Sequence, residues 1–330
     1  MTQIASGAIP ADRAPPASLA RRTERLHRLV FAGLLVLLVV APFVAYPIFL
    51  MKVMCYALFA LAFNLLLGYG GLLSFGHAAY FGLASYVCAW LLKTHGVPPE
   101  IAVLCAVGAS ALLGLIFGAI AIRRQGIYFA MVTLALAQMI YFFALQATGF
   151  TGGEDGIQSV RRGWLFGLFD LSSDRVLYAA VAAVFFGSTA LIYRVIHSPF
   201  GQVCKAIRDN EARAISLGYD ANRYKLMVFV LSAGFAGLAG SLKAIVFQIA
   251  ALPDVHWSMS GEVVLMTLVG GLATVFGPIV GALVIVSMQN YLAEFGAWVT
   301  IIQGAIFLVC VMTFREGIVG RISKKTGIPL

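Results

Sequence analysis

Long apolar runs, separated by short polar or glycine-rich segments, make up most of this chain. A helix needs about 20 apolar residues to cross a bilayer, and most of the runs approach that length. The candidate spans are residues 30–47, 48–67, 77–92, 101–122, 127–147, 176–196, 226–249, 263–286 and 298–314. The pattern predicts an all-α, polytopic bundle of membrane helices over residues 29–314, between an N-terminal tail of residues 1–28 and a C-terminal tail of residues 315–330.

One polar segment, residues 197–225, interrupts the apolar pattern. In it, small apolar residues such as Ala206, Ile207 and Ala214 recur at helical spacing among charged residues. This spacing predicts short amphipathic helices that lie at a membrane face. A protein that only passed solute through the bilayer has little need of such a surface, so the segment indicates a binding site for a cytoplasmic partner.

Two glycine-rich segments predict interrupted helices. Residues 262–291 are long for one span and short for two, and the glycines at 270, 271, 277 and 281 favour a broken or re-entrant pair of half-helices. Residues 68–82 are also dense in glycine, which favours unwound backbone beside a cavity. Residues 70–76 and 270–277 resemble each other weakly and are a candidate repeat of two structural halves.

Basic residues set the expected orientation. The first apolar run is preceded by Arg21, Arg22, Arg25 and Arg28. Because such flanks face the cytoplasm, segment 197–225 falls inside and residues 148–175 fall outside. The C-terminal tail is also basic, so we expect an even count of about eight to ten spans, with both termini cytoplasmic. Membrane anchoring therefore accounts for the net charge of +9, and nucleic-acid binding is not predicted.

Composition limits the chemistry that the chain itself carries. The sequence is 61% hydrophobic and 11% charged, whereas soluble domains are about 25% charged, so there is no room for a separate soluble catalytic module. No Gly-x-x-x-x-Gly-Lys-Ser/Thr loop is present to hold nucleotide phosphates. The five cysteines are scattered, and no metal site is predicted from them.

Polar groups within the predicted spans are sparse. A charge in lipid costs at least about 2.5–3.5 kcal/mol, so Lys243 must find a partner, snorkel to the bilayer surface or line water, and snorkelling is the favoured expectation. No Asp or Glu falls within a predicted span, which removes the usual proton or sodium relay. Ser74 and His77 leave an intramembrane hydrolase or lipid transferase as one alternative, although no neighbouring acid orients the histidine. A stand-alone secondary transporter or channel is the other alternative.

Five sequence blocks occur together in this chain. They are residues 68–82 (G-Y-G-G-L-L-S-F-G-H-A-A-Y-F-G), 128–134 (Y-F-A-M-V-T-L), 151–156 (T-G-G-E-D-G), 198–201 (S-P-F-G) with 206–211 (A-I-R-D-N-E), and 236–240 (A-G-L-A-G). In this order they resemble the permease subunit of bacterial branched-chain amino acid ABC importers, the Liv type. The resemblance covers residues 68–281 and is specific because it rests on all blocks together.

The resemblance implies partners and a substrate. It implies that the chain pairs with a second, homologous permease subunit in the bacterial inner membrane, above two cytoplasmic ATPase subunits and below a periplasmic substrate-binding protein. ATP and Mg would be bound by the ATPase subunits, so the resemblance implies no cofactor in this chain and no enzyme activity of its own. The implied substrates are leucine, isoleucine and valine, or related small amino acids and amides.

The resemblance also assigns residues to roles. Segment 197–225 is implied to hold the coupling helix that seats in a groove of an ATPase subunit, although Arg213 stands where the usual Glu-Ala-Ala signature has its second alanine. The expected coupling residues are Pro199, Gly201, Ala206, Arg208, Asp209, Glu211, Ala212 and Gly218. The expected translocation path is formed by Ser74, His77, Tyr80, Tyr128, Thr133 and Gln138. The loop expected to meet the binding protein contains Thr151, Gly152, Gly153, Asp155 and Gly156.

Overall fold

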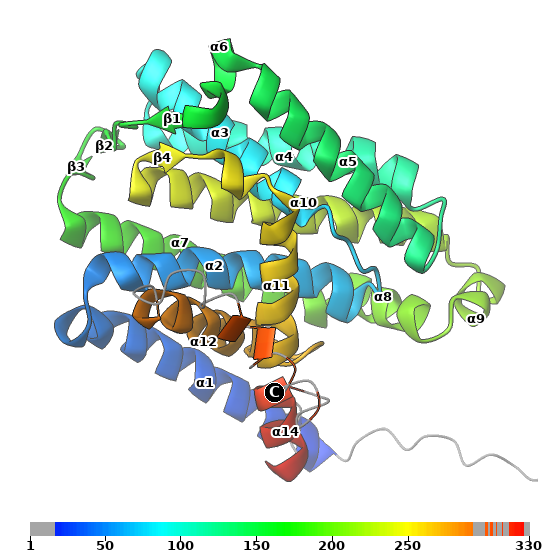
Figure 1. The fold of residues 1–330 in the computed structure, drawn as a ribbon. Coiled ribbons are helices and arrows are strands. Elements are labelled where there is room, and N and C mark those ends of the chain that lie inside the picture. Colours follow the sequence, from blue (N-terminus) through cyan, green and yellow to red (C-terminus); the bar gives the residue numbers. More distant parts are fainter. Residues whose placement is uncertain are drawn as a thin grey trace, which may run out of the picture.

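Two apolar helices form the centre of the structure. The computed structural model describes residues 17–292 and 317–326, together with residues 301, 302, 304, 305, 308 and 312. Helix α2 (Pro47–Asn64), which continues as the π-helix η1 (Leu65–Tyr69), and helix α10 (Ala221–Phe247) are buried along most of their length. Helices that are apolar on all sides are typical of a bundle core, and α2 and α10 pack on each other there (Figure 1).

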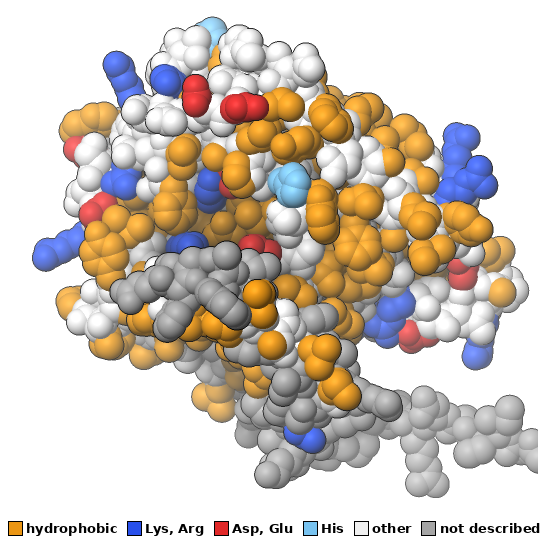
Figure 2. All heavy atoms as spheres, in the orientation of Figure 1, with side chains coloured by type: hydrophobic (Ala, Val, Ile, Leu, Met, Phe, Trp, Pro, Cys, Tyr) orange, Lys and Arg blue, Asp and Glu red, His pale blue; other side chains and the backbone are white. Residues whose placement is uncertain are grey.

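Five further long helices surround this centre. They are α1 (Ala17–Val44), α3 (His77–Thr94), α4 (Pro99–Ala121), α5 (Ile127–Gln146) and α7 (Asp174–His197). Helices α4 and α5 each leave an apolar face exposed, with Leu104 and Phe142 as examples. Figure 2 shows hydrophobic side chains over much of the visible surface. Such a surface is expected where the surroundings are lipid or another membrane subunit.

The predicted polytopic helical architecture is confirmed. Within the described residues, five helices are long and apolar enough to cross a membrane, at 47–69, 99–121, 127–146, 174–197 and 221–247. The expected total of eight to ten spans stays a prediction, and the span expected at 298–314 lies largely outside the described residues. The division into tails and a membrane domain also stays a prediction.

The predicted broken helix near the C-terminal end is confirmed. Helix α11 (Trp257–Gly270) and helix α12 (Gly277–Tyr291) are separated by six non-helical residues, 271–276, named here the second break. A Cβ atom on Gly281 would lie 1.8 Å from the carbonyl oxygen of Met266, so the glycine lets the two half-helices touch. Figure 1 shows α11 running across the direction of α2 and α10.

The glycine-rich segment after α2 is also interrupted. Residues 70–76, named here the first break, separate η1 from α3. Ala78, in the first turn of α3, donates its N–H to the hydroxyl of Ser260 on α11 over 2.9 Å. The end of the first break is therefore tied directly to a half-helix of the broken pair.

Short elements occupy one end of the bundle. They are α6 (Thr148–Thr151), η2 (Gly153–Asp155), β1 (Ile157–Gln158), β2 (Trp164–Leu165), β3 (Phe169–Asp170), β4 (Ile249–Ala250) and η3 (Leu252–Asp254). Strand β1 pairs with β4, and β2 with β3, both antiparallel. These strands depart from the all-α prediction because two-residue strands are too short to show alternation in a sequence.

The opposite end carries α8 (Pro199–Asp209) and α9 (Glu211–Ser216). Figure 1 shows these two helices far from β1–β3, with the long helices between them. This agrees with the expectation that segments 148–175 and 197–225 lie on opposite sides. Helix α14 (Gly317–Thr326) packs on α11 and α12, where Gly317 lies against Gly271 of the second break.

Candidate functional site

Three side-chain caps shape the polar segment 197–225, called the coupling loop from here on. The Ser198 hydroxyl accepts from the N–H of Gly201 (3.3 Å) at the start of α8, where Pro199 takes the first helical position. Asn210 accepts from the N–H of Arg213 (3.0 Å) and starts α9, and Asp220 caps α10. Because each cap starts a new helix, the chain turns sharply twice instead of continuing as one rod.

One side of the coupling loop packs on the bundle. Ile207, Ala214 and Ala221 form a small buried apolar cluster, and the ring of Phe200 stacks on Tyr224 of α10. The ammonium of Lys225 contacts the carboxylate of Glu211 at 2.6 Å, which fixes the start of α9 against α10. Burial raises the pKa of the nearby Cys204 thiol to about 11, so this cysteine is an inert packing residue.

The other side of the coupling loop is uncovered. The apolar side chains of Ile215, Leu217 and Tyr219 are exposed, as are Arg213 and Asp209. The amphipathic helices predicted from the sequence are therefore confirmed. Their outer surface combines apolar groups with charges of both signs, which suits a helix seated in a partner's groove.

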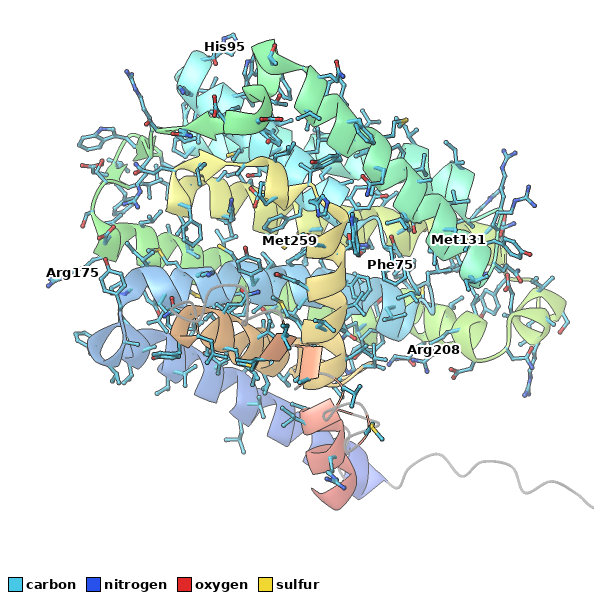
Figure 3. All side chains as sticks on the ribbon, viewed as in Figure 1. Phe75, His95, Met131, Arg175, Arg208 and Met259 are labelled. Carbon is cyan, nitrogen blue, oxygen red and sulfur yellow. The ribbon has the colours of Figure 1, made fainter. Side chains whose placement is uncertain are left out.

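The inner side of α8 holds η1 and the first break. The Arg208 guanidinium donates to the carbonyl oxygen of Gly68, and the ammonium of Lys205 lies 5.3 Å from the centre of the Tyr69 ring. A Cβ on Gly71 would lie 2.7 Å from Cγ of Arg208, so the backbone of the first break touches the arginine stem. Figure 3 shows Arg208 at the α8 end, away from Arg175 and His95 at the other end.

Burial within the protein and the positive charge of Arg208 lower the pKa of Lys205. The Arg208 guanidinium also pairs with the carboxylate of Asp209 at 2.7 Å, which offsets part of this positive charge. Two cations and one acid of α8 thus lie where the coupling loop meets the end of α2. The contact between α8 and η1 is therefore sensitive to any charge that a partner brings close to it.

Two side chains of α2 and η1 tie the first break to the second. The Asn64 amide donates to the carbonyl of Thr274 (2.8 Å), and its oxygen accepts from the N–H of Ala273 (3.0 Å). The Tyr69 hydroxyl donates to the carbonyl of Ala273 (2.9 Å). Asn64 is 1% exposed, so these bonds replace helical hydrogen bonds that the unwound residues cannot make.

The residues expected to form the path fall into two groups. Ser74, His77, Tyr80 and Thr133 are buried near the first break. The Thr133 hydroxyl accepts from the N–H of Phe75 (3.2 Å), which joins the first break to α5. Figure 3 shows Phe75 near this junction. Tyr128 is 69% exposed and Gln138 is half-buried on α5, so the structure does not bring these two into the buried group.

Ser74 and His77 do not contact each other as a nucleophile and a base would. The Ser74 hydroxyl accepts from the N–H of Gly76, while Nε2 of His77 lies 2.8 Å from the hydroxyl of Ser232. The histidine ring is packed among the rings of Phe63, Tyr80 and Phe229, and it is fully buried. This environment fits a packing role and offers no access for a hydrolysable substrate.

The loop of residues 151–156 is built from tight turns. Gly152 and Gly156 have φ of 77° and 67°, where a side chain is strained, and the Thr151 hydroxyl donates to the carbonyl of Ala147. Beyond Gly156, β1 pairs with β4. Asp155 points its side chain to the exterior, and Gly153 is buried. The loop is therefore a fixed support that presents acidic groups at the end opposite the coupling loop.

One expectation about a charged group is wrong, and one acidic residue lies in the broken helix. Lys243 does not snorkel, because its ammonium contacts the carboxylate of Asp254 at 2.6 Å, and both residues are buried. Residues 252–254 fold back as η3 onto the last turn of α10, which brings the acid to the lysine. In addition, Glu262 lies within α11, so an acidic residue does occur inside the broken helix.

Lys52, Asp254 and Glu262 were missed in the sequence as candidate site residues. Lys52 lies within the second predicted span, and a cation inside an apolar run is itself a signal of function. Glu262 is the first residue of the broken segment 262–291 and directly precedes the span predicted at 263–286. Because of this boundary, it was not counted among the residues within a span. Asp254 lies in a loop and could not be paired with Lys243 without the fold.

Known proteins are similar to this chain over most of its length. The family described as "Branched-chain amino acid transport system / permease component" matches residues 46–311. The permease LivM of Salmonella typhimurium is 27% identical over 287 residues, covering 80% of this chain and 68% of LivM. LivH of Escherichia coli is 21% identical, covering 81% and 91%, and BraD of Pseudomonas aeruginosa is 24% identical, covering 81% and 92%. No solved structure matches this chain significantly.

Proposed function

Since this chain belongs to the branched-chain amino acid transport permease family, we propose that it is a permease subunit of an ABC importer. Its substrates are leucine, isoleucine and valine, or related small amino acids and amides. LivM, LivH and BraD are described as high-affinity branched-chain amino acid transport permeases, and this supports the substrate class. The chain itself is not an enzyme, and ATP and Mg are bound by separate ATPase subunits.

The coupling loop is the docking site of an ATPase subunit. Its inner side is packed on α10 and its outer side exposes Ile215 and Leu217 beside charged groups. An exposed apolar helix face with a charged rim is typical of a surface that another protein covers. A second permease subunit pairs with this chain through the exposed apolar faces of the bundle.

The observation that carries this proposal is the continuous contact from the coupling loop to both breaks. Arg208 bonds to Gly68 of η1, and Asn64 and Tyr69 bond to Ala273 and Thr274. When nucleotide binding moves the ATPase, α8 moves with it and shifts the equilibrium between inward-open and outward-open arrangements of the breaks. The buried group around Ser74, His77, Tyr80 and Thr133 lies beside the first break and forms part of the gate, with Tyr128 and Gln138 on the same helix as Thr133.

In the orientation expected from the basic residues that flank the spans, the two ends of the bundle lie on opposite sides of the inner membrane. Both termini and the coupling loop face the cytoplasm. The turn of residues 151–156 faces the periplasm, where Glu154 and Asp155 are exposed to meet a binding protein. Charges at such a rim govern encounter and orientation more than affinity.

Uptake by the reconstituted complex tests this function. The chain is co-expressed with its second permease, ATPase and binding-protein subunits and placed in vesicles, and ATP-dependent uptake of labelled leucine is compared with ATP hydrolysis. We expect leucine uptake only with ATP and the binding protein. Uptake by this chain alone without ATP would identify a secondary transporter or channel instead.

Charge reversals in the coupling loop sharpen that test. In Arg208→Glu and Glu211→Arg we expect ATP hydrolysis to continue while leucine uptake falls at least about tenfold, because the charged contacts of α8 and α9 are reversed. Arg175→Glu reverses an exposed charge at the opposite end and serves as the matched control. Normal coupled uptake in both coupling-loop variants would contradict the proposed docking site.

A further inference from the structure

A cavity opens at the end of the bundle opposite the coupling loop. It has a volume of about 470 Å³ and is lined by Phe49 and Lys52 of α2, Phe247 of α10, and Asn290 and Tyr291 of α12, among others. Sites for small molecules are typically about 300–1,000 Å³ and combine apolar walls with a few polar groups. The size and lining of this cavity therefore suit a small ligand with both apolar and polar parts.

Charged side chains of both signs lie near this cavity, and Lys52 is the charged residue among those that line it. Lys52 lies within electrostatic reach of Glu262 of α11, and Glu262 lies beside the side chain of Gln289 on α12. Gln289 directly precedes Asn290, which lines the cavity. Three helices thus bring a cation, an acid and an amide together. Figure 2 shows basic and acidic side chains in the hollow between α10 and α2.

Two lysine–acid pairs at this end differ in one respect. The ammonium of Lys243 and the carboxylate of Asp254 are in contact at 2.6 Å and are almost fully buried. Lys52 and Glu262 are only half-buried, and within the described residues neither has an ion-pair partner within 4 Å. A charge kept in a membrane protein without a contacting partner marks a functional group, because the apolar surroundings make it costly.

We propose that Lys52 and Glu262 form a receiving site for a zwitterionic amino acid, and this rests on the proposed function. The Lys52 ammonium binds the carboxylate of the amino acid, and the Glu262 carboxylate binds its ammonium group. The apolar walls at Phe49 and Phe247 contact the aliphatic side chain. Two separated opposite charges match the ends of a zwitterion, whereas a closed ion pair would leave nothing to bind.

This assignment also explains how a loose site accepts several aliphatic amino acids. The charged groups recognise the part that leucine, isoleucine and valine share. The aromatic walls make few directional contacts, so they discriminate weakly between aliphatic side chains. A site of this kind binds the substrate when it leaves the binding protein and releases it toward the breaks.

Competition on the unmodified complex tests the assignment without any risk of misfolding. Labelled leucine binding to the purified permease–ATPase complex, without binding protein, is competed with unlabelled leucine, leucinamide and 4-methylpentanoate. Leucinamide lacks the carboxylate and 4-methylpentanoate lacks the ammonium group, so each should compete at least about tenfold more weakly than leucine. Equal competition by all three, or no saturable leucine binding, would overturn the assignment.

Paired substitutions separate recognition from structure. Lys52→Met with Glu262→Gln removes both charges together, and we expect leucine uptake to fall at least about tenfold while stimulation of ATP hydrolysis by the binding protein persists. The matched control is Lys243→Met with Asp254→Asn, which neutralises the closed pair and should retain uptake, because replacing such a pair is often neutral for stability. Normal uptake by the first double variant, or equal losses in both, would overturn the assignment.

Failure of this inference can be told apart from failure of the proposed function. If the wild-type complex shows no ATP-dependent leucine uptake, the proposed function is wrong. If the wild-type complex transports leucine and the Lys52 and Glu262 double variant does so equally well, only the receiving site is wrong. If the double variant does not assemble, the competition measurement on the wild-type complex decides.

Discussion

The first break and the second break interrupt two helical regions in similar ways but are held by different parts of the molecule. The first break lies directly against α8, through Gly71 and the neighbouring Gly68 and Tyr69. The second break is held from the other side, by Asn64 and Tyr69 of α2 and η1. The coupling loop therefore reaches the first break by contact and the second through the end of α2.

This difference makes the end of α2 the point where the two breaks are joined. The chain there is a π-helix, which is rare, occurs mostly as single turns within α-helices and is frequent at functional sites. A small shift of η1 under Arg208 changes the position of Asn64 and Tyr69, and with them the backbone of residues 273 and 274. We therefore expect substitutions at the end of α2 to disturb both breaks. Substitutions in α8 should disturb the first break and the coupling of leucine uptake to ATP hydrolysis.

The largest effect is expected from Asn64→Ala. It leaves the buried N–H of Ala273 and the carbonyl of Thr274 without their partners, and two such groups should cost about 2–6 kcal/mol of stability. Thermal unfolding of the purified complex measures this loss, and uptake should be abolished. Asn222→Ala, on the exposed start of α10, is the control for removing an asparagine. Unchanged stability in Asn64→Ala would show that the breaks are not joined here.

A smaller effect on stability, but a clear one on coupling, is expected from Arg208→Ala. The variant loses a charged hydrogen bond to Gly68, and because the arginine is partly exposed the cost should be only about 1 kcal/mol. The number of leucine molecules taken up per ATP hydrolysed should nevertheless fall. Arg223→Ala, at an exposed site on the same end, should leave this ratio intact. An unchanged ratio of leucine uptake to ATP hydrolysis in Arg208→Ala would show that α8 does not transmit the movement of the ATPase to the breaks.

The smallest effect on leucine uptake is expected from Gly71→Ala, although its cost in stability is not the smallest. Gly71 has φ of +70°, so alanine should cost about 1–2 kcal/mol, and its methyl group would also displace the Arg208 stem. Gly96→Ala is the matched control, because Gly96 has φ of +58° but open space around its Cβ position. The difference in uptake between the two variants reports the contact between α8 and the first break. Equal uptake would mean that this contact has no part in transport.

The breaks and the coupling loop could be predicted from the sequence because their signals are local. Glycines at 270, 271, 277 and 281 in a run of intermediate length indicated the second break, and the mixture of small apolar and charged residues indicated α8 and α9. Helix periodicity and glycine content act over one or two turns, so the order of residues carries the information.

The contacts that join these elements could not be predicted because they are long-range. Asn64 is separated from Thr274 by 210 positions, and Arg208 from Gly68 by 140. The pairing of Lys243 with Asp254 is closer in sequence, yet it depends on η3 folding back at the end of α10. A polar residue in an apolar run shows that a partner is needed, but only the fold shows which partner it is.

Site-directed crosslinking tests most directly whether the coupling loop is where an ATPase acts on this chain. In a variant whose native cysteines are replaced by alanine, Leu217→Cys places a thiol on the exposed surface beyond α9, and Leu168→Cys places one at similar exposure at the opposite end. We predict that the thiol at position 217 crosslinks to an ATPase subunit in the assembled complex and that the thiol at position 168 does not. Crosslinks from position 168 alone, or from neither position, would contradict the account.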